Sequence, residues 1–187
     1  MKKIILILCL ALVSMFAYAQ QTGTFKDIRD GKVYKTVKIG TRWFFAENLA
    51  YKPNSNRYLD QNNDTSFVSK YGYLYTWDDA KGSCPKGWHV PSKKEWETLF
   101  DFLGGDKTIM YDKLKEGGSS GFNVKLCGFG ADGTRFLGAG SVTFFWSSTP
   151  TADKGSYYFR CSSDGITALY VEDFNHISGY SVRPIKD

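Results

Sequence analysis

Histidine and cysteine are scarce in this sequence, and their spacing argues against the common structural metal sites. The 187 residues include only two histidines, His89 and His176, and four cysteines. Three of the cysteines, Cys84, Cys127 and Cys161, lie in the body of the chain, at spacings that match no zinc-binding pattern. A structural zinc ion needs four such ligands close together, so we expect no bound metal and no other cofactor.

The sequence also has no apolar run long enough to span a membrane, so we expect no transmembrane segment. Its N-terminus carries Lys2 and Lys3, followed by an apolar run over residues 4–16, whereas a spanning helix needs about 20 residues. Residues 17–19 read Ala-Tyr-Ala, the small-x-small pattern of a signal-peptidase site. We therefore predict a signal peptide over residues 1–19 and an exported protein that is secreted, periplasmic or on the outer cell surface.

A large excess of charge is missing as well. The formal net charge is +5, and two of the positive charges, Lys2 and Lys3, fall in the predicted leader. The remaining excess is small and not clustered, so we expect no nucleic-acid partner. Aromatic residues are abundant instead, at 17% of the chain, and together with 19 glycines they favour short strands, many turns and a core of large side chains.

One β-hairpin and one loop are predicted early in the chain. Apolar residues alternate over residues 33–46 around an Ile39-Gly40-Thr41 turn, which is typical of a hairpin. The polar residues 20–32 read as a flexible lead-in, and residues 50–70 read as the longest loop. Residues 71–75 indicate a short aromatic strand.

Two helices follow, each with its own start signal. Thr76 and Asp79 have the spacing of a capping box, and so do Ser92 and Glu95 at the start of the clearest helix. That second helix has one apolar stripe, which consists of Trp96, Leu99, Phe100 and Leu103.

The part of the chain after residue 120 reads as strands and turns. Candidate strands, separated by glycine-rich turns, cover residues 122–127, 143–148, 157–162, 167–172 and 180–185. The order of a hairpin, two helices and an antiparallel sheet predicts a single α+β domain over residues 20–187.

Six phrases of the chain carry a resemblance to one known family. In chain order they lie in residues 30–40, 43–49, 71–77, 84–96, 145–149 and 179–183. Together they resemble the Fibrobacter succinogenes major paralogous domain, over roughly residues 24–187. The resemblance implies a bacterial, exported, cell-surface protein. It also implies a C-type-lectin-like fold, shared with formylglycine-generating enzymes, with two helices packed on a twisted antiparallel sheet.

The cysteines depart from the pattern of that family. Its members commonly end in Ser-Val-Arg-Cys, and that cysteine looks like the partner of the one in Cys-Pro-x-Gly-Trp. Pro184 stands at the C-terminal position here, which leaves Cys84 without the usual partner. Cys127 and Cys161 both fall on predicted strands, and a disulfide between them stays open because the sequence does not give their separation.

The same resemblance makes a formylglycine-generating-enzyme-like oxidoreductase the alternative function. Its copper-dependent relatives use a C-terminal cysteine pair, and its iron-dependent relatives use a histidine cluster. This chain has no close cysteine pair in its C-terminal part, and its two histidines are far apart in sequence. We therefore expect His89 to be a structural residue that hydrogen-bonds the backbone. The calcium-binding motifs of sugar-binding C-type lectins are missing too, since Trp146-Ser147-Ser148 stands where Trp-Asn-Asp is needed.

Because the motifs for metal-dependent catalysis and calcium-dependent sugar binding are missing, we expect the later strands to serve in recognition. Alternation along residues 157–162 puts Tyr158 and Arg160 on one face, and arginine is rarely buried unpaired, so we expect this pair to face outward. With Tyr170 and Phe174 they form the candidate binding residues. We expect a non-enzymatic recognition or adhesion module for a protein or polysaccharide, with a purely structural envelope protein as a further alternative.

Overall fold

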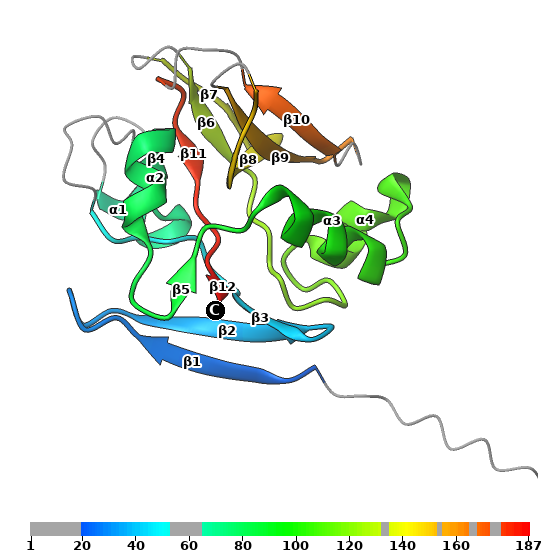
Figure 1. Ribbon diagram of the computed structural model, residues 1–187, viewed down its shortest axis with the longest axis horizontal. Coiled ribbons are helices and arrows are strands. Elements are labelled where there is room, and N and C mark those ends of the chain that lie inside the picture. The colour runs from blue at the N-terminus through cyan, green and yellow to red at the C-terminus, as the bar shows by residue number, and fades with distance from the viewer. Residues whose placement is uncertain (1–19, 53–64, 132–134, 153–154, 165–167, 173–176) are drawn as a thin grey trace, which may run out of the picture.

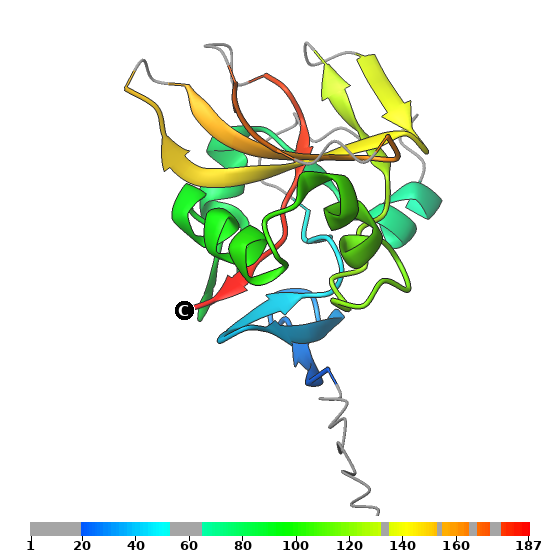
Figure 2. The same cartoon turned by 90° about the vertical axis from the view of Figure 1, so that its right-hand side faces the viewer.

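The computed structural model describes residues 20–52, 65–131, 135–152, 155–164, 168–172 and 177–187. The predicted signal peptide, residues 1–19, lies outside this described part of the chain. Two β-sheets form the outer layers of the fold, and the helices lie at a level between them (Figure 1, Figure 2). The chain is therefore mixed α+β, as the sequence predicts.

The first sheet is built on the predicted hairpin. Its five strands stand in the order β1 (Thr22–Lys26), β2 (Val33–Ile39), β3 (Arg42–Phe45), β12 (Ile185–Lys186) and β5 (Trp88–His89). All of its pairs are antiparallel, and β2 turns into β3 at Gly40, whose φ of 60° suits glycine. The C-terminal strand thus lies between strands from the first half of the chain.

The second sheet contains the later strands. Its main path runs β10 (Ala168–Glu172), β9 (Ser156–Ser162), β8 (Val142–Pro150), β11 (Tyr180–Ser181) and β4 (Leu74–Tyr75). A second hairpin of β6 (Cys127–Ala131) and β7 (Arg135–Ala139) joins through β6 to β8. The pairs β6–β8 and β8–β11 are parallel, so the predicted wholly antiparallel sheet is wrong at these two places.

Four helices lie in the described part of the chain, where two were expected: α1 (Thr65–Tyr71), α2 (Trp77–Ser83), α3 (Lys93–Phe102) and α4 (Lys107–Leu114). Both predicted N-caps are confirmed. Thr76 accepts from the Asp79 amide, and Ser92 with Glu95 makes a complete capping box at the start of α3. None of the described helices is long and apolar enough to cross a membrane.

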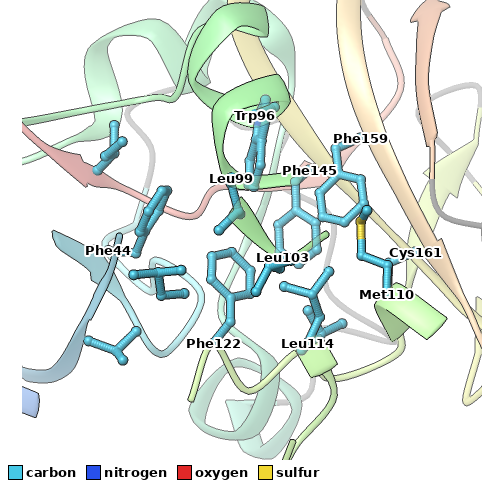
Figure 3. Close-up of a cluster of buried hydrophobic side chains, with 14 of the residues drawn as sticks. Phe44, Trp96, Leu99, Leu103, Met110, Leu114, Phe122, Phe145, Phe159 and Cys161 are labelled. Atoms are coloured by element: carbon cyan, nitrogen blue, oxygen red, sulfur yellow. The ribbon is translucent and has the colours of Figure 1, made fainter. Parts of the chain in front are cut away.

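The main core lies where α3 meets the inner faces of both sheets (Figure 3). Trp96 of α3 is fully buried, and its ring lies 6.0 Å from that of Phe145 and 5.0 Å from that of Phe159. The first sheet contributes several side chains to this core: Val37, Ile39, Phe44 and Ile185. The predicted apolar stripe of α3 is confirmed in this packing, with Phe100 partly buried at its edge.

Several segments differ from the sequence prediction. The expected strand over residues 71–75 is formed only at β4, since Tyr71 ends α1. The expected lead-in contains β1, which pairs along its whole length with β2. Of the residues in β1, only Phe25 points to the core, so the strand shows little alternation of apolar and polar residues. The expected loop over residues 50–70 ends in α1. The expected strand at residues 122–127 is not formed before Cys127, because Asn123 adopts a φ of 56° and interrupts the extended backbone.

The expected strand at residues 180–185 is split between the two sheets. Its first part is β11 in the second sheet, and its last residue begins β12 in the first. Between them the backbone carbonyls of Val182 and Pro184 accept hydrogen bonds from the amides of Leu49 and Phe45. This crossing segment carries Arg183 through the interior of the protein.

Candidate functional site

Strand β9 has two faces, as the alternation of its sequence predicts. Phe159 is fully buried against α3, and its ring lies 4.9 Å from that of Phe100. Tyr157 shares the inner direction and lies beneath Lys93, whose Nζ is 4.8 Å from its ring centre. Tyr158 and Arg160 alternate with these residues and point to the other side of the sheet, where both are half-buried.

On that outer side four rings make a continuous cluster, which we call the aromatic face: Phe129 of β6, Phe144 of β8, Tyr158 of β9 and Tyr180 of β11. Tyr180 is the centre, with ring distances of 4.9 Å to Phe144, 5.2 Å to Tyr158 and 6.3 Å to Phe129. Phe129 and Phe144 also touch directly, at 4.7 Å. Helix α3 lies on the other side of this sheet, where Trp96 contacts Phe145 and Phe159.

The inner end of the cluster is fixed by Trp146. This ring is fully buried, lies 4.2 Å from Tyr180, and donates its Nε1 hydrogen to the backbone carbonyl of Tyr75. Tyr180 itself is only 4% exposed, whereas Phe129, Phe144 and Tyr158 are half-buried. The three half-buried rings therefore pack on Tyr180, which itself packs on Trp146. They form a rigid apolar surface that includes the phenolic hydroxyl of Tyr158.

Arg160 lies in register with this surface, since its Cα pairs with that of Phe144. Its guanidinium is 3.3 Å from the carboxylate of Asp164, and Ser162 donates to the same carboxylate. The side chain of Arg160 is 24% exposed. The exposed part of this ion pair contributes little to stability, about 0–1 kcal/mol, so it provides polar groups beside the rings more than it supports the fold.

The other two candidate residues are less fully placed. Tyr170 lies on β10 directly opposite Tyr158 in the strand register. Phe174 lies outside the described residues. The sequence reasoning missed Phe129 and Phe144, although the alternation of Phe144 with the core residue Phe145 in a predicted strand was a usable signal.

The cysteines do not form the disulfide that the sequence left open. Cys127 and Cys161 are both free, buried thiols. Cys127 lies next to Gly128, which pairs with Thr143 of β8 on one side, and Cys161 pairs with Thr143 on the other. The strand β8 therefore separates them by two strand spacings, about 10 Å, which exceeds the reach of a disulfide.

His89 contacts carboxylates, so the expectation that it bonds the backbone is wrong. Its Nδ1 is 2.6 Å from Asp187, and its Nε2 is 3.0 Å from both oxygens of Glu95. Glu95 also accepts from Arg42 at 2.8 Å and closes the capping box of α3. This cluster ties the start of α3 to β3 and β5. Within the described residues, no group of three or more histidine, cysteine or acidic side chains is placed to hold a metal ion.

Comparison with known protein families identifies a match. The model of the Fibrobacter succinogenes major domain family matches residues 37–186, which is most of the chain. No curated protein and no solved structure matches the chain. The matched region includes all of the aromatic face and the crossing segment around Arg183.

Proposed function

The chain belongs to the Fibrobacter succinogenes major domain family, and from that premise we propose that it is an exported, non-enzymatic recognition or adhesion module of the bacterial envelope. It acts in the periplasm, on the outer surface or in the medium, after removal of its leader. Its ligand is a protein or a polysaccharide, bound across the outer side of the second sheet.

The observation that carries this proposal is the aromatic face. Phe129, Phe144 and Tyr158 are half-buried rings held rigid by Tyr180 and Trp146, with a polar rim at Arg160. Rigid aromatic groups lose little conformational entropy on binding and bury a large area, which is why they dominate binding surfaces. A purely structural envelope protein would not need this arrangement on the side of the sheet away from α3.

The oxidoreductase alternative has less support from the thiols. Burial raises the pKa of Cys84 to about 12, and burial also raises the pKa of Cys127. A thiol with so high a pKa carries almost no thiolate at neutral pH, and the thiolate is the reactive form and the metal ligand. These two side chains are therefore suited to packing.

We further propose the C-type-lectin-like form of the α+β fold that the family resemblance implies. It is supported by the insertion of the C-terminal strands β11 and β12 between earlier strands of both sheets. A crystal structure tests this assignment, since its strand order either superposes on a C-type lectin domain or does not.

Binding is tested with the mature chain on a glycan array and in a pull-down from envelope protein fractions, which separates the two ligand classes. Tyr158→Ala and Phe144→Ala should weaken the detected binding about tenfold or more, as expected for central aromatic contacts. Tyr157→Ala is the matched control, because this neighbour in the same strand faces α3. Equal losses in all three variants, or silence in both assays with a folded chain, would instead favour a structural role.

A further inference from the structure

Arg183 is a buried cation whose hydrogen-bond partners in the described part of the chain are all neutral. It is 1% exposed, and its guanidinium donates to the amide oxygen of Asn48 and to the backbone carbonyls of Phe45 and Phe122. The rings of Phe122 and Phe145 lie beside it, at 4.5 Å and 5.4 Å from the guanidinium carbon. No carboxylate among the described residues forms an ion pair with it. Burial lowers the pKa of Arg183 to about 9, so the charge is still present at neutral pH.

A small polar pocket begins at this arginine. Its volume is about 60 Å³, and its wall combines the segment after β3, the end of α1 and the residues that precede β6: Lys32, Ala46, Glu47, Asn48, Ser69, Lys70, Tyr71, Gly72, Asn123, Lys125 and Arg183. One buried water needs roughly 10–15 Å³ of such free volume. The pocket therefore has room for a few waters or for one small polyatomic group.

The charge of the wall is strongly positive. The wall carries four cations, which are Lys32, Lys70, Lys125 and Arg183, and one acidic side chain, Glu47. Glu47 already accepts a hydrogen bond from the backbone amide of Lys35 at 2.8 Å. These four cations reach the pocket from four separate parts of the chain. Such a concentration of like charge is unfavourable unless an anion or solvent compensates it.

The individual lysines are available for an added partner. The Nζ of Lys32 lies over the neutral ring of Tyr34, and that of Lys70 lies over the ring of Tyr71. Lys125 has an acidic neighbour, Glu116, at 3.4 Å, and this carboxylate is largely exposed. Exposed ion pairs of this kind are weak, so Lys125 can turn to a better-placed anion at little cost.

A wider depression continues from the same lysines. It has a volume of about 290 Å³ and shares Lys70, Tyr71 and Lys125 with the small pocket. It adds Lys115, Tyr111 and one acidic side chain, Glu116, so lysines still outnumber carboxylates in its wall. A group held in the small pocket can therefore belong to a larger molecule that lies along this surface. The depression would also carry positive charge beside that molecule.

We propose that the Arg183 pocket binds one oxyanion group, a carboxylate, phosphate or sulfate, carried by a larger ligand. The three groups share the chemistry that the pocket offers, which is several N–H donors with positive charge around a volume of this size. This site does not depend on the aromatic face, and its residues lie on different strands and loops. A failure of the recognition proposal would leave it intact.

The test is isothermal titration of the mature chain with inorganic phosphate, sulfate and acetate at constant ionic strength, with chloride as the reference anion. We expect saturable binding of at least one oxyanion, and the preferred one identifies the group. The double variant Lys70→Ala/Lys125→Ala should bind it about tenfold or more weakly, since charge-assisted hydrogen bonds are lost.

The matched control is Lys86→Ala/Lys94→Ala, which removes the same charge from two exposed lysines outside the pocket. Both double variants leave Arg183 in place, so neither removes its buried hydrogen bonds. The proposal is overturned if no oxyanion binds more tightly than chloride, or if the control variant loses affinity as much as the pocket variant.

Discussion

The amide oxygen of Asn48 accepts two hydrogen bonds from Arg183, one from Nε at 3.1 Å and one from Nη2 at 2.6 Å. The amide nitrogen of Asn48 donates to the carbonyl of Tyr71 at 2.8 Å and to the hydroxyl of Ser181 at 3.1 Å. One buried side chain thus joins the segment after β3, the end of α1 and the segment that crosses between the sheets. Its loss would leave groups without a partner at the end of α1, at Ser181 and at Arg183.

Asn48→Ala should therefore lower the free energy of unfolding by about 3 kcal/mol, because the buried guanidinium of Arg183 and the part-buried carbonyl of Tyr71 lose a partner. Urea denaturation followed by tryptophan fluorescence measures this change. Gln21→Ala, which truncates an exposed amide side chain, should cost less than about 0.5 kcal/mol. Similar values for the two variants would show that the Asn48–Arg183 contact does not stabilise the fold.

A comparison of Gly72 and Gly31 separates two reasons why a position requires glycine, which are a positive φ and a lack of space for a Cβ atom. Both have positive φ, 78° and 77°. A Cβ on Gly72 would lie 2.5 Å from the carbonyl oxygen of Leu49, whereas a Cβ on Gly31 would meet nothing within 4 Å. Gly31→Ala should cost about 1 kcal/mol for the backbone conformation alone, and Gly72→Ala should cost more, because the clash adds to the same conformational cost.

The measurement is again chemical denaturation of both glycine variants under identical conditions. The difference between them estimates the clash with Leu49, because the backbone conformations match. Equal costs would mean that the backbone near Leu49 moves easily to admit a methyl group.

Glu95 should make stability depend on acid pH. Burial alone would raise the pKa of Glu95, but hydrogen bonds from the Ser92 amide, from His89 and from the Ser92 hydroxyl lower it below its ordinary value of 4.5. A carboxyl group with a lowered folded-state pKa stabilises the protein fully above its unfolded pKa. That contribution is lost as the pH falls through the lower pKa of the folded state. Glu95→Gln should lower stability by about 1 kcal/mol at pH 7 and flatten the decline below about pH 4.5.

Thermal unfolding from pH 7 to pH 3 measures this dependence. Glu97→Gln on the same helix is the control, because the ion pair of Glu97 with Lys93 is longer, at 3.6 Å, and half-exposed. If the Glu95 variant kept the full acid dependence of the parent protein, another carboxyl group would be responsible for it.

The parts of the fold that the sequence predicts are those with local causes. The Ser92–Glu95 capping box and the stripe on α3 depend on residues a few positions apart, and both are confirmed. The hairpin of β2 and β3 is confirmed for the same reason, since the turn at Gly40 and the alternation around it are local. On β9, alternation alone separates the buried Phe159 from the half-buried Tyr158.

The parts that the sequence does not predict depend on distant partners. β1 is a strand because β2 offers it a free edge. The short α4 is held by Met110 and Leu114, which are buried, and by Tyr111, which is partly buried against the same core. The aromatic face contains rings from four strands, so the sequence pattern of no single segment predicts it. The pocket at Arg183 is also not predicted by any sequence pattern, because its lysines lie in separate segments and only the fold brings them together.

The thiols should be inert in the native protein. Burial raises the pKa of Cys84 to about 12, which leaves on the order of a thousandfold less thiolate at neutral pH than a free cysteine has. Cys127 and Cys161 are fully buried, and Cys127 contacts the hydroxyls of Thr143 and Ser181 at 3.0 Å and 3.2 Å. An aromatic disulfide reagent should therefore label the mature chain slowly when folded and at all three cysteines after unfolding in urea.

Ser119→Cys provides the comparison, because Ser119 is exposed and a thiol there should react within the dead time of the native assay. Intact mass spectrometry of the parent protein before and after reduction completes the test. Since β8 lies between Cys127 and Cys161, reduction should leave the mass unchanged. A mass increase on reduction would reveal a disulfide among the three cysteines and contradict the prediction. Labelling of native Cys84 as fast as that of Ser119→Cys would contradict the expected inertness of its thiol.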